Sequence, residues 1–261
     1  MSQNMSYSDY LKLDQILKAQ SRVSNDEHDE MLFIVIHQVY ELWFKQILHE
    51  MSFFTTQLEQ NRIFQCQATL GRVLKILKTM VSQLDILETL TPLNYSTFRD
   101  QLRSSSGFQS VQFRKLEFFL GFKNEKMLSY FSDQPEAHAD LTKAYESPAF
   151  YDHFLSYLSR CELAIPEELL NRDVRCPIEP NEQVEEILFE IYRNKPNMAN
   201  LCEQIVDLDE GIQEWRYRHV KMVERTIGSK TGTGGSSGAA YLKSTLFRSF
   251  FPDLWNVRNR F

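Results

Sequence analysis

Glycine and proline, the residues that turns require, are scarce in this sequence. Its 261 residues include nine glycines and eight prolines, about half of the roughly 12% that the two contribute on average. This excludes a collagen-like or low-complexity chain and disfavours β-sandwiches and barrels, which need a turn after each short strand. The length fits one large domain or two small ones. Hydrophobic residues make up 43% of the chain, including 19 phenylalanines, which is enough for a large core.

Positive charge and closely spaced cysteines are also lacking. The net charge of −6 argues against nucleic acid as a partner, because neutralising phosphates requires a basic surface. The four cysteines never form a CxxC pair, which predicts reduced cytosolic thiols instead of a disulfide framework or a zinc site. They are Cys66, Cys161, Cys176 and Cys202.

Signals for export and for membrane insertion are missing too. The N-terminus, MSQNMSYSDYLKLDQ, has no basic region followed by an apolar one, so no secretory signal is visible. The longest apolar stretch, 31–54, is interrupted by charged and histidine side chains, whereas a bilayer helix needs about 20 mostly apolar residues. We therefore expect a soluble cytoplasmic protein that does not contact membranes.

Apolar residues recur at steps of three and four along most of the chain, the pattern of amphipathic helices. Ser24 to Glu27 match a capping box at the start of the first long helix. No internal repeat or change of composition marks a domain boundary, so we predict one all-α domain over 1–261. The helices are expected over 24–58, 68–90, 95–102, 108–122, 182–192 and 198–227, with shorter ones within 133–175.

The segment 228–238 is the exception, since it holds five of the nine glycines. Ordering so much backbone freedom costs conformational entropy, so the native state must fix this loop by some interaction. The Walker motif GxxxxGK[ST] is absent, and a dinucleotide fingerprint would follow a strand where this segment follows a helix. On composition alone, a flexible surface loop is the favoured interpretation.

Two histidines fall on apolar helix faces. His219 continues the spacing of Leu208, Ile212 and Trp215, about two turns before the glycine-rich segment, and His37 lies one turn after Phe33. Taken alone, each position is more typical of a hydrogen-bonded core histidine than of a metal ligand. Spacing does not decide between the two interpretations.

Tyr95 and Arg99 form a third group, four residues apart on a short predicted helix. A guanidinium binds a carboxylate through two parallel hydrogen bonds, and a neighbouring phenol would complete an anion clamp. The simpler alternative is a surface arginine paired with Asp100. Neither a Ser/His/Asp array nor a pair of catalytic carboxylates can be assembled from the sequence.

Several motifs together are more specific than any one of them. They resemble the signature of the tryptophan 2,3-dioxygenase family, in the family's order, from about Ser6 to the C-terminal region, and the short form without inserts resembles bacterial members. The motifs are FIVIHQVYELWFKQ (33–46), YSTFRD (95–100), SGFQS (106–110), WRYRHV (215–220), and GSKTGTGGSSG (228–238) followed by Tyr241 and Leu242.

The resemblance implies an all-helical haem enzyme. Family members insert both atoms of O2 across the indole C2–C3 bond of L-tryptophan, giving N-formyl-L-kynurenine in the first step of the kynurenine pathway. By the match, His219 would be the axial ligand of the iron of one haem b per subunit, ferrous when active. The haem would be non-covalent, because no CxxCH is present. A core histidine suits this role, since haem needs a dry pocket and one fixed axial nitrogen.

The same match assigns the substrate site. His37 would face the indole N–H, and we favour orientation of the ring over proton abstraction, because an indole N–H is too weak an acid for an imidazole base. Tyr95 and Arg99 would hold the substrate carboxylate, and Thr233 would meet the amino-acid head group as the loop closes. The indole side of the pocket would be lined by Phe33, Ile34, Val35, Ile36 and His37.

The family's quaternary structure supplies one more expectation. The N-terminal segment 1–20 would pack on a neighbouring subunit of a homotetramer, with Tyr7, Tyr10 and Leu11 reaching into the neighbour's pocket. Three alternatives are a haem-binding sensor without turnover, a helical scaffold without a cofactor, and the indole-oxygenating relatives known as indoleamine dioxygenases. A carboxylate clamp at Tyr95 and Arg99 argues against the sensor, which has no use for one.

Overall fold

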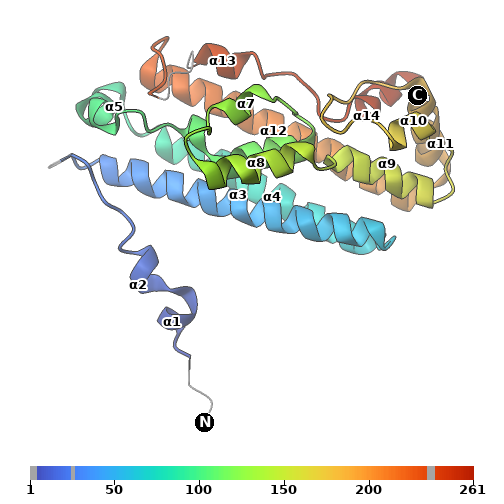
Figure 1. The fold of residues 1–261 in the computed structure, drawn as a ribbon, viewed down its shortest axis with the longest axis horizontal. Coiled ribbons are helices and arrows are strands. Elements are labelled where there is room, and N and C mark those ends of the chain that lie inside the picture. The colour runs from blue at the N-terminus through green and yellow to red at the C-terminus, as the bar shows by residue number, and fades with distance from the viewer. Residues whose placement is uncertain (1–4, 25–26, 234–238) are drawn as a thin grey trace.

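The computed structural model describes residues 5–24, 27–233 and 239–261 (Figure 1). All regular structure in these ranges is helical, which confirms the all-α prediction. The α-helices are α1 (Tyr7–Leu11), α2 (Leu13–Ile16), α3 (Glu30–Glu59), α4 (Ile63–Leu87), α5 (Pro92–Arg99), α6 (Val111–Leu120), α7 (Lys126–Ser129), α8 (Pro135–Glu146), α9 (Phe150–Arg160), α10 (Glu167–Leu170), α11 (Glu182–Asn194), α12 (Pro196–Ile227), α13 (Ala239–Lys243) and α14 (Pro252–Asn256). Short 3-10 helices are η1 (Asp100–Leu102), η2 (Gly107–Gln109) and η3 (Val257–Arg260).

Three long helices build the body of the molecule. α4 packs along both α3 and α12, so these three form the central layer against which the shorter helices lie (Figure 1). α4 and α12 come close at Gly211, where an added Cβ would lie 3.3 Å from Cδ1 of Leu77. A glycine in mid-helix costs about 1 kcal/mol, and here it makes room for the neighbouring helix.

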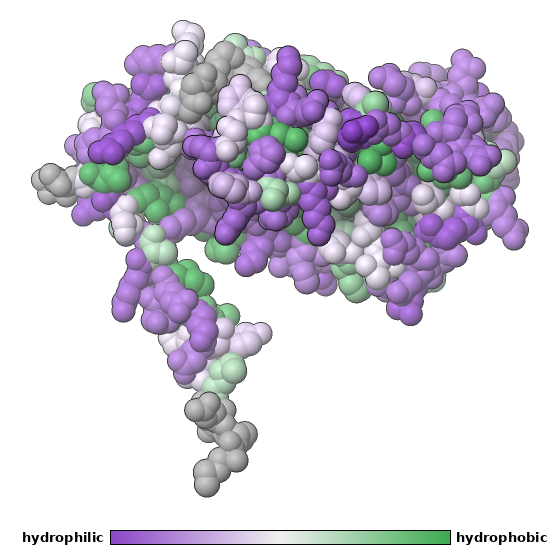
Figure 2. All heavy atoms as spheres, in the orientation of Figure 1, coloured by the Kyte–Doolittle hydropathy of each residue, from purple (hydrophilic) through white to green (hydrophobic). Residues whose placement is uncertain are grey.

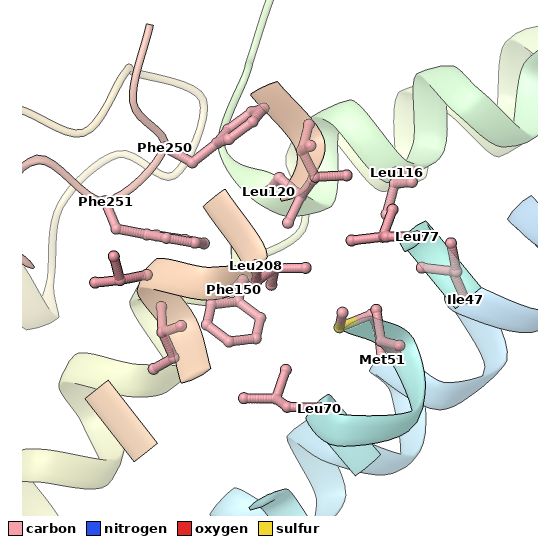
Figure 3. Packing of buried hydrophobic residues seen from close by; sticks show 14 of the residues in the cluster. Ile47, Met51, Leu70, Leu77, Leu116, Leu120, Phe150, Leu208, Phe250 and Phe251 are labelled. Carbon is pink, nitrogen blue, oxygen red and sulfur yellow. The ribbon is translucent and has the colours of Figure 1, made fainter. Parts of the chain in front are cut away.

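The core is continuous from α3 and α4 to the C-terminal segment. Figure 3 shows Met51 of α3 and Leu70 of α4 facing Phe150 of α9, Leu208 of α12 and Phe251. All five side chains are at most 1% exposed. Phe150 stacks on Phe54 with the ring centroids 4.9 Å apart. This core fixes α3 and α12 relative to each other, and with them His37 and His219.

The predicted capping box at the start of the first long helix is wrong. The Ser24 hydroxyl donates to the Glu30 carboxylate, which also accepts the backbone N–H groups of Val23 and Ser24 at 2.7 and 2.9 Å. The Glu27 carboxylate instead accepts from the Thr97 hydroxyl at 2.7 Å. Because both capping side chains have other partners, α3 begins only at Glu30. Asn25 and Asp26 of the predicted motif lie outside the described residues.

Local capping also moves other predicted boundaries. α5 starts at Pro92 because the Thr91 hydroxyl accepts the N–H of Asn94, and its last predicted turn is the separate η1. The hydroxyl of Ser110 caps α6, which divides the predicted helix 108–122 into η2 and α6. α4 begins five residues earlier than predicted. The N-terminal bounds of α11 and α12 fall within two residues of the prediction.

The N-terminal arm stands away from the body. α1 and α2 contain no buried residue, and Figures 1 and 2 show them projecting from the end of the bundle near α5. The arm joins the body where the Gln20 amide bonds the Gln38 side chain and Gln38 bonds the carbonyl of Ala19. Within the described ranges no helix combines the length and apolar character that crossing a bilayer requires.

Candidate active site

A deep cavity opens between α3, α5, α12 and the segment 105–110. The space inside it, together with the open solvent at its mouth, is about 1590 Å³. Its walls are largely apolar and aromatic, with Tyr40, Phe44 and Phe113 among them. Of the predicted site residues, it brings together Phe33, Ile36, His37, Tyr95, Arg99, His219 and Thr233.

His219 projects into this cavity from α12. Its ring stacks on Trp215, one turn earlier, with centroids 5.1 Å apart and planes 5° from parallel. Burial, and secondarily the neighbouring His37, lower the pKa of His219 to about 4. The imidazole is therefore neutral at pH 7, and a neutral imidazole can offer a nitrogen lone pair to a metal.

His37 faces the same cavity from α3. Its Nδ1 lies 2.7 Å from the carbonyl oxygen of Phe33, so Nδ1 carries the proton and donates to that oxygen. This tautomer leaves Nε2 as a hydrogen-bond acceptor. Burial lowers the pKa of His37, and the bond to Phe33 and the charge of Glu41 offset this only in part. The neutral form therefore prevails at pH 7.

The mouth of the cavity is bounded by α5 and by the beginning of the glycine-rich loop. Arg99 Nη2 donates to the carbonyl of Thr231 at 2.8 Å, and the Thr233 hydroxyl donates to the carbonyl of Ser105. Arg99 Nε is buried and has no hydrogen-bond partner among the described residues. Burial raises the pKa of Tyr95, although the nearby Arg99 charge opposes this, so the phenol stays protonated. Both residues can donate to an anion.

Other predicted positions lie elsewhere. Ile34 lines a second, adjoining cavity, whereas Val35 lines neither and is 39% exposed. Two residues after Phe33 a helix has turned to its opposite side, so Val35 faces away from this cavity, and its place at the substrate stays a prediction. Tyr7 and Tyr10 are 75% and 71% exposed on the arm, and Leu11 beside them is only partly buried.

Sequence reasoning missed the charged groups on the cavity wall. Arg114 and Glu117 of α6 and Arg216 of α12 are buried there and bonded to one another. The sequence pattern that could have predicted them is a charged residue on an otherwise apolar helix face, which occurs at all three positions. Glu41, also missed, lines both cavities and accepts from the Gln112 amide at 2.9 Å.

The side chains that line the cavity suit a metal held in a macrocycle better than a bare metal ion. The described part of the chain contains no group of three histidine, cysteine or acidic residues able to hold a bare ion. Two neutral imidazoles, His37 from α3 and His219 from α12, instead face a largely apolar cavity, and a haem iron needs one such nitrogen and apolar walls around its flat ring. Fold and site thus define an all-α protein with a largely apolar cavity that two neutral histidines face.

Comparison with known proteins gives the family. The model of the family described as tryptophan 2,3-dioxygenase matches residues 1–160 and 181–261. A tryptophan 2,3-dioxygenase of Herpetosiphon aurantiacus is 53% identical over 99% of both chains. One from an Anaeromyxobacter species is 50% identical over 97% of this chain and 95% of its own, and one from Bacillus thuringiensis is 45% identical over 99% and 93%. The chain belongs to the tryptophan 2,3-dioxygenase family and is an enzyme.

Proposed function

We propose that this enzyme inserts both atoms of O2 across the C2–C3 bond of L-tryptophan to give N-formyl-L-kynurenine. The observation that carries the proposal is one cavity in which two neutral histidines meet an arginine with a free buried donor. An aromatic wall, an N–H acceptor and a carboxylate clamp match the indole ring, its N–H and the amino-acid end of tryptophan. Family membership supports the same substrate.

Haem b is the proposed cofactor, and His219 would ligate its iron. Haem supplies the ferrous iron that binds O2 for reaction with the indole ring. The protein's part is to hold the ligand nitrogen neutral and in one orientation. The stacked Trp215 ring fixes the plane of His219 and covers one of its faces. Tyr40, Phe44 and Phe113 contribute apolar surface that excludes water.

His37 is proposed to orient the substrate ring. Its Nε2 can accept the indole N–H because Nδ1 is committed to the Phe33 carbonyl. Phe33 packs on His37, with ring centroids 4.1 Å apart, and restricts its rotation. The chain thereby offers a fixed acceptor next to a flat aromatic wall, which holds the indole in one pose. An imidazole whose pKa is lowered by burial is a weak base, so His37 is not proposed to abstract the indole proton.

The amino-acid end is proposed to bind at the cavity mouth. Arg99, through Nε and Nη2, and the Tyr95 hydroxyl would be the donors for the substrate carboxylate, and Thr233 would meet the head group. Without substrate, Arg99 holds the carbonyl of Thr231 and Thr233 holds that of Ser105. Binding tryptophan would exchange these two bonds for bonds to substrate, which couples substrate entry to the position of the loop.

Assembly and location are proposed from the remaining features. The arm exposes apolar side chains of Tyr7 and Tyr10 that this chain does not cover, which supports packing of segment 1–20 on a neighbouring subunit of a homotetramer. The rest of the chain, in which the long helices and the C-terminal segment share one large core, is proposed to be a single domain. Four cysteines without disulfides fit the reducing cytoplasm.

Two variants test the assignment together. His219→Ala should lose the Soret absorbance of the reconstituted enzyme, because the axial ligand is gone. Arg99→Ala should keep that absorbance but bind tryptophan at least about tenfold more weakly, since a hydrogen bond to a charged group contributes about 1.5–3 kcal/mol. An unchanged Soret spectrum in His219→Ala would contradict the ligand assignment. Haem binding without any product from tryptophan would favour the sensor alternative.

A further inference from the structure

A buried carboxylate lies where the N-terminal arm, formed by α1 and α2, joins the body. Glu30, the first residue of α3, is 1% exposed. Its Oε1 accepts the backbone N–H of Val23 at 2.7 Å. Its Oε2 accepts the backbone N–H of Ser24 at 2.9 Å and also the Ser24 hydroxyl. One side chain of the body therefore receives three hydrogen bonds from the segment that connects it to the arm.

Glu30 carries a negative charge in the folded protein. Burial alone would raise its pKa, but the hydrogen bonds from Ser24 and Val23, helped by the charge of Arg22, lower the pKa of Glu30 below the ordinary value of 4.5. The carboxylate is therefore ionised at pH 7. Hydrogen bonds to an ionised acceptor are stronger than bonds between neutral groups, so this attachment of the connecting segment to α3 is a strong one.

A second attachment of the connecting segment to α3 is made by neutral groups. The Gln20 amide donates to the Gln38 side chain at 2.6 Å, and the Gln38 amide donates to the carbonyl of Ala19 at 3.0 Å. Beyond it, α1 and α2 contain no buried residue, and Figures 1 and 2 show both helices projecting away from the body. The polar contacts of residues 19–24 therefore determine the direction in which the arm leaves the body.

We propose that Glu30 is the anchor that holds the N-terminal arm in the direction needed to reach a neighbouring copy of this chain. This inference rests on the proposed function, which packs segment 1–20 on a neighbouring subunit. A segment that is already fixed at its root loses less conformational freedom when it docks, so docking is more favourable. Glu30 is thus a positioning residue for the assembly, because it acts through the arm.

The test is hydrogen exchange of the backbone amides in the full-length enzyme, which measures local opening. Isolated helices as short as α1 and α2 are not stable in water, and this chain buries no residue of either. Slow exchange over 7–16 in the unmodified enzyme therefore reports contact with a neighbouring copy. The readout is the exchange rate over 7–16, compared with the rates at Val23 and Ser24.

Glu30→Gln should speed exchange at least about tenfold, equivalent to about 1.4 kcal/mol, both at Val23 and Ser24 and over 7–16. A side-chain amide has one acceptor oxygen and no charge, so it cannot replace the three bonds. Ser24→Ala keeps the carboxylate and removes one bond, so it should speed exchange at the same amides by a smaller factor. Exchange within α4 should not change, which separates release of the arm from a general loss of folding. If Glu30→Gln also loses protection in α4, Ser24→Ala decides the comparison.

Glu50→Gln is the matched control. Glu50 is a second buried carboxylate, further along α3, and it accepts from Arg72 and Gln46 instead of from the arm. Exchange over 7–24 in this variant should equal that of the unmodified enzyme.

Slow exchange over 7–16 that stays unchanged in both Glu30→Gln and Ser24→Ala would overturn the role of Glu30, while the proposed assembly still stood. Faster exchange confined to Val23 and Ser24 would overturn it too, because the carboxylate would then hold only its own turn of the chain. Fast exchange over 7–16 in the unmodified enzyme would show that the arm does not pack on a neighbour, which would overturn the proposed assembly together with this inference.

Discussion

The role of His37 can be measured as a single hydrogen bond. The perturbation is a double-mutant cycle between His37→Ala and a tryptophan analogue, 3-benzothienyl-alanine, in which sulfur replaces the indole N–H without added bulk. If Nε2 of His37 accepts that N–H, each change alone removes the same bond. Making both changes should then cost less than the sum of the two single effects.

The expected magnitude follows from the geometry at His37. Its Nδ1 is bound to the Phe33 carbonyl at 2.7 Å, so one neutral acceptor meets one neutral donor. Such a bond contributes about 0.5–1.5 kcal/mol. The coupling free energy should therefore be about 1 kcal/mol. Because about 1.4 kcal/mol corresponds to a tenfold change in affinity, this is about a fivefold effect. Affinities are read anaerobically from the ferrous Soret band, so that turnover does not contribute.

The same bond has a pH dependence whose sign is fixed by the His37 environment. Burial lowers the pKa of His37 below its ordinary value of 6.5. Only the neutral ring can accept at Nε2, so the coupling should be complete at pH 7 and should disappear as the pH falls below 6.5 through the lowered pKa. The affinity of the unmodified enzyme for tryptophan should therefore fall at acidic pH, and the affinity of His37→Ala should not show this decrease. His153→Ala is the control, since His153 is also partly buried with a lowered pKa but lies outside the cavity.

Two results would refute this account of His37. A cycle with no coupling would show that Nε2 does not bind the indole N–H. A loss of about 10²–10⁴-fold in kcat for His37→Ala, the contribution typical of general acid–base catalysis, would show that the imidazole moves a proton in the reaction. The orientation role predicts instead that substantial kcat remains.

Three further variants probe the clamp and the scaffold. Arg99→Lys should restore only part of the tryptophan affinity that Arg99→Ala loses, because an ammonium cannot form the two parallel bonds of a guanidinium. A titration of the ferrous enzyme with tryptophan measures the affinity. An Arg99→Lys variant that binds tryptophan as tightly as the unmodified enzyme would argue against a bidentate clamp. Asp209→Ala should lower the free energy of unfolding by at least about 3 kcal/mol in urea denaturation, because three donors lose the buried carboxylate at about 1–3 kcal/mol each. They are the backbone N–H groups of Phe250 and Phe251 and the Trp255 ring N–H. A loss below about 1 kcal/mol, the net contribution of one ordinary hydrogen bond, would contradict it. Gly211→Val should cost about 1–3 kcal/mol through overlap with Leu77, and thermal unfolding unchanged from the parent would show that the helices can separate at no cost.

The sequence could predict features that depend on local periodicity. The long helices α3, α4 and α12 follow from apolar spacing, and His37 and His219 could be placed on inward faces for the same reason. Spacing also paired Arg99 with Tyr95 as a possible anion clamp, and resemblance to a family assigned that clamp to the substrate carboxylate. The resemblance alone added Thr233, which no spacing rule would have selected.

Features that depend on contacts between distant segments could not be predicted. α3 starts late because Glu27 bonds Thr97, 70 residues away. Arg216 and Glu117 are 99 residues apart in sequence, so their ion pair exists only in the folded chain. Val35 was assigned to the pocket because it lies inside a family motif, but helix geometry turns it outward.

The measurement that tests the central claim most directly is an anaerobic absorbance spectrum of the reduced, haem-supplied enzyme, followed by addition of L-tryptophan and then of air. We predict a ferrous Soret band that shifts on addition of tryptophan, and growth of N-formylkynurenine absorbance once O2 enters. His219→Ala, treated identically, should give neither. Absence of haem uptake by the unmodified protein, or a haem band with no product after O2 is added, would contradict the account.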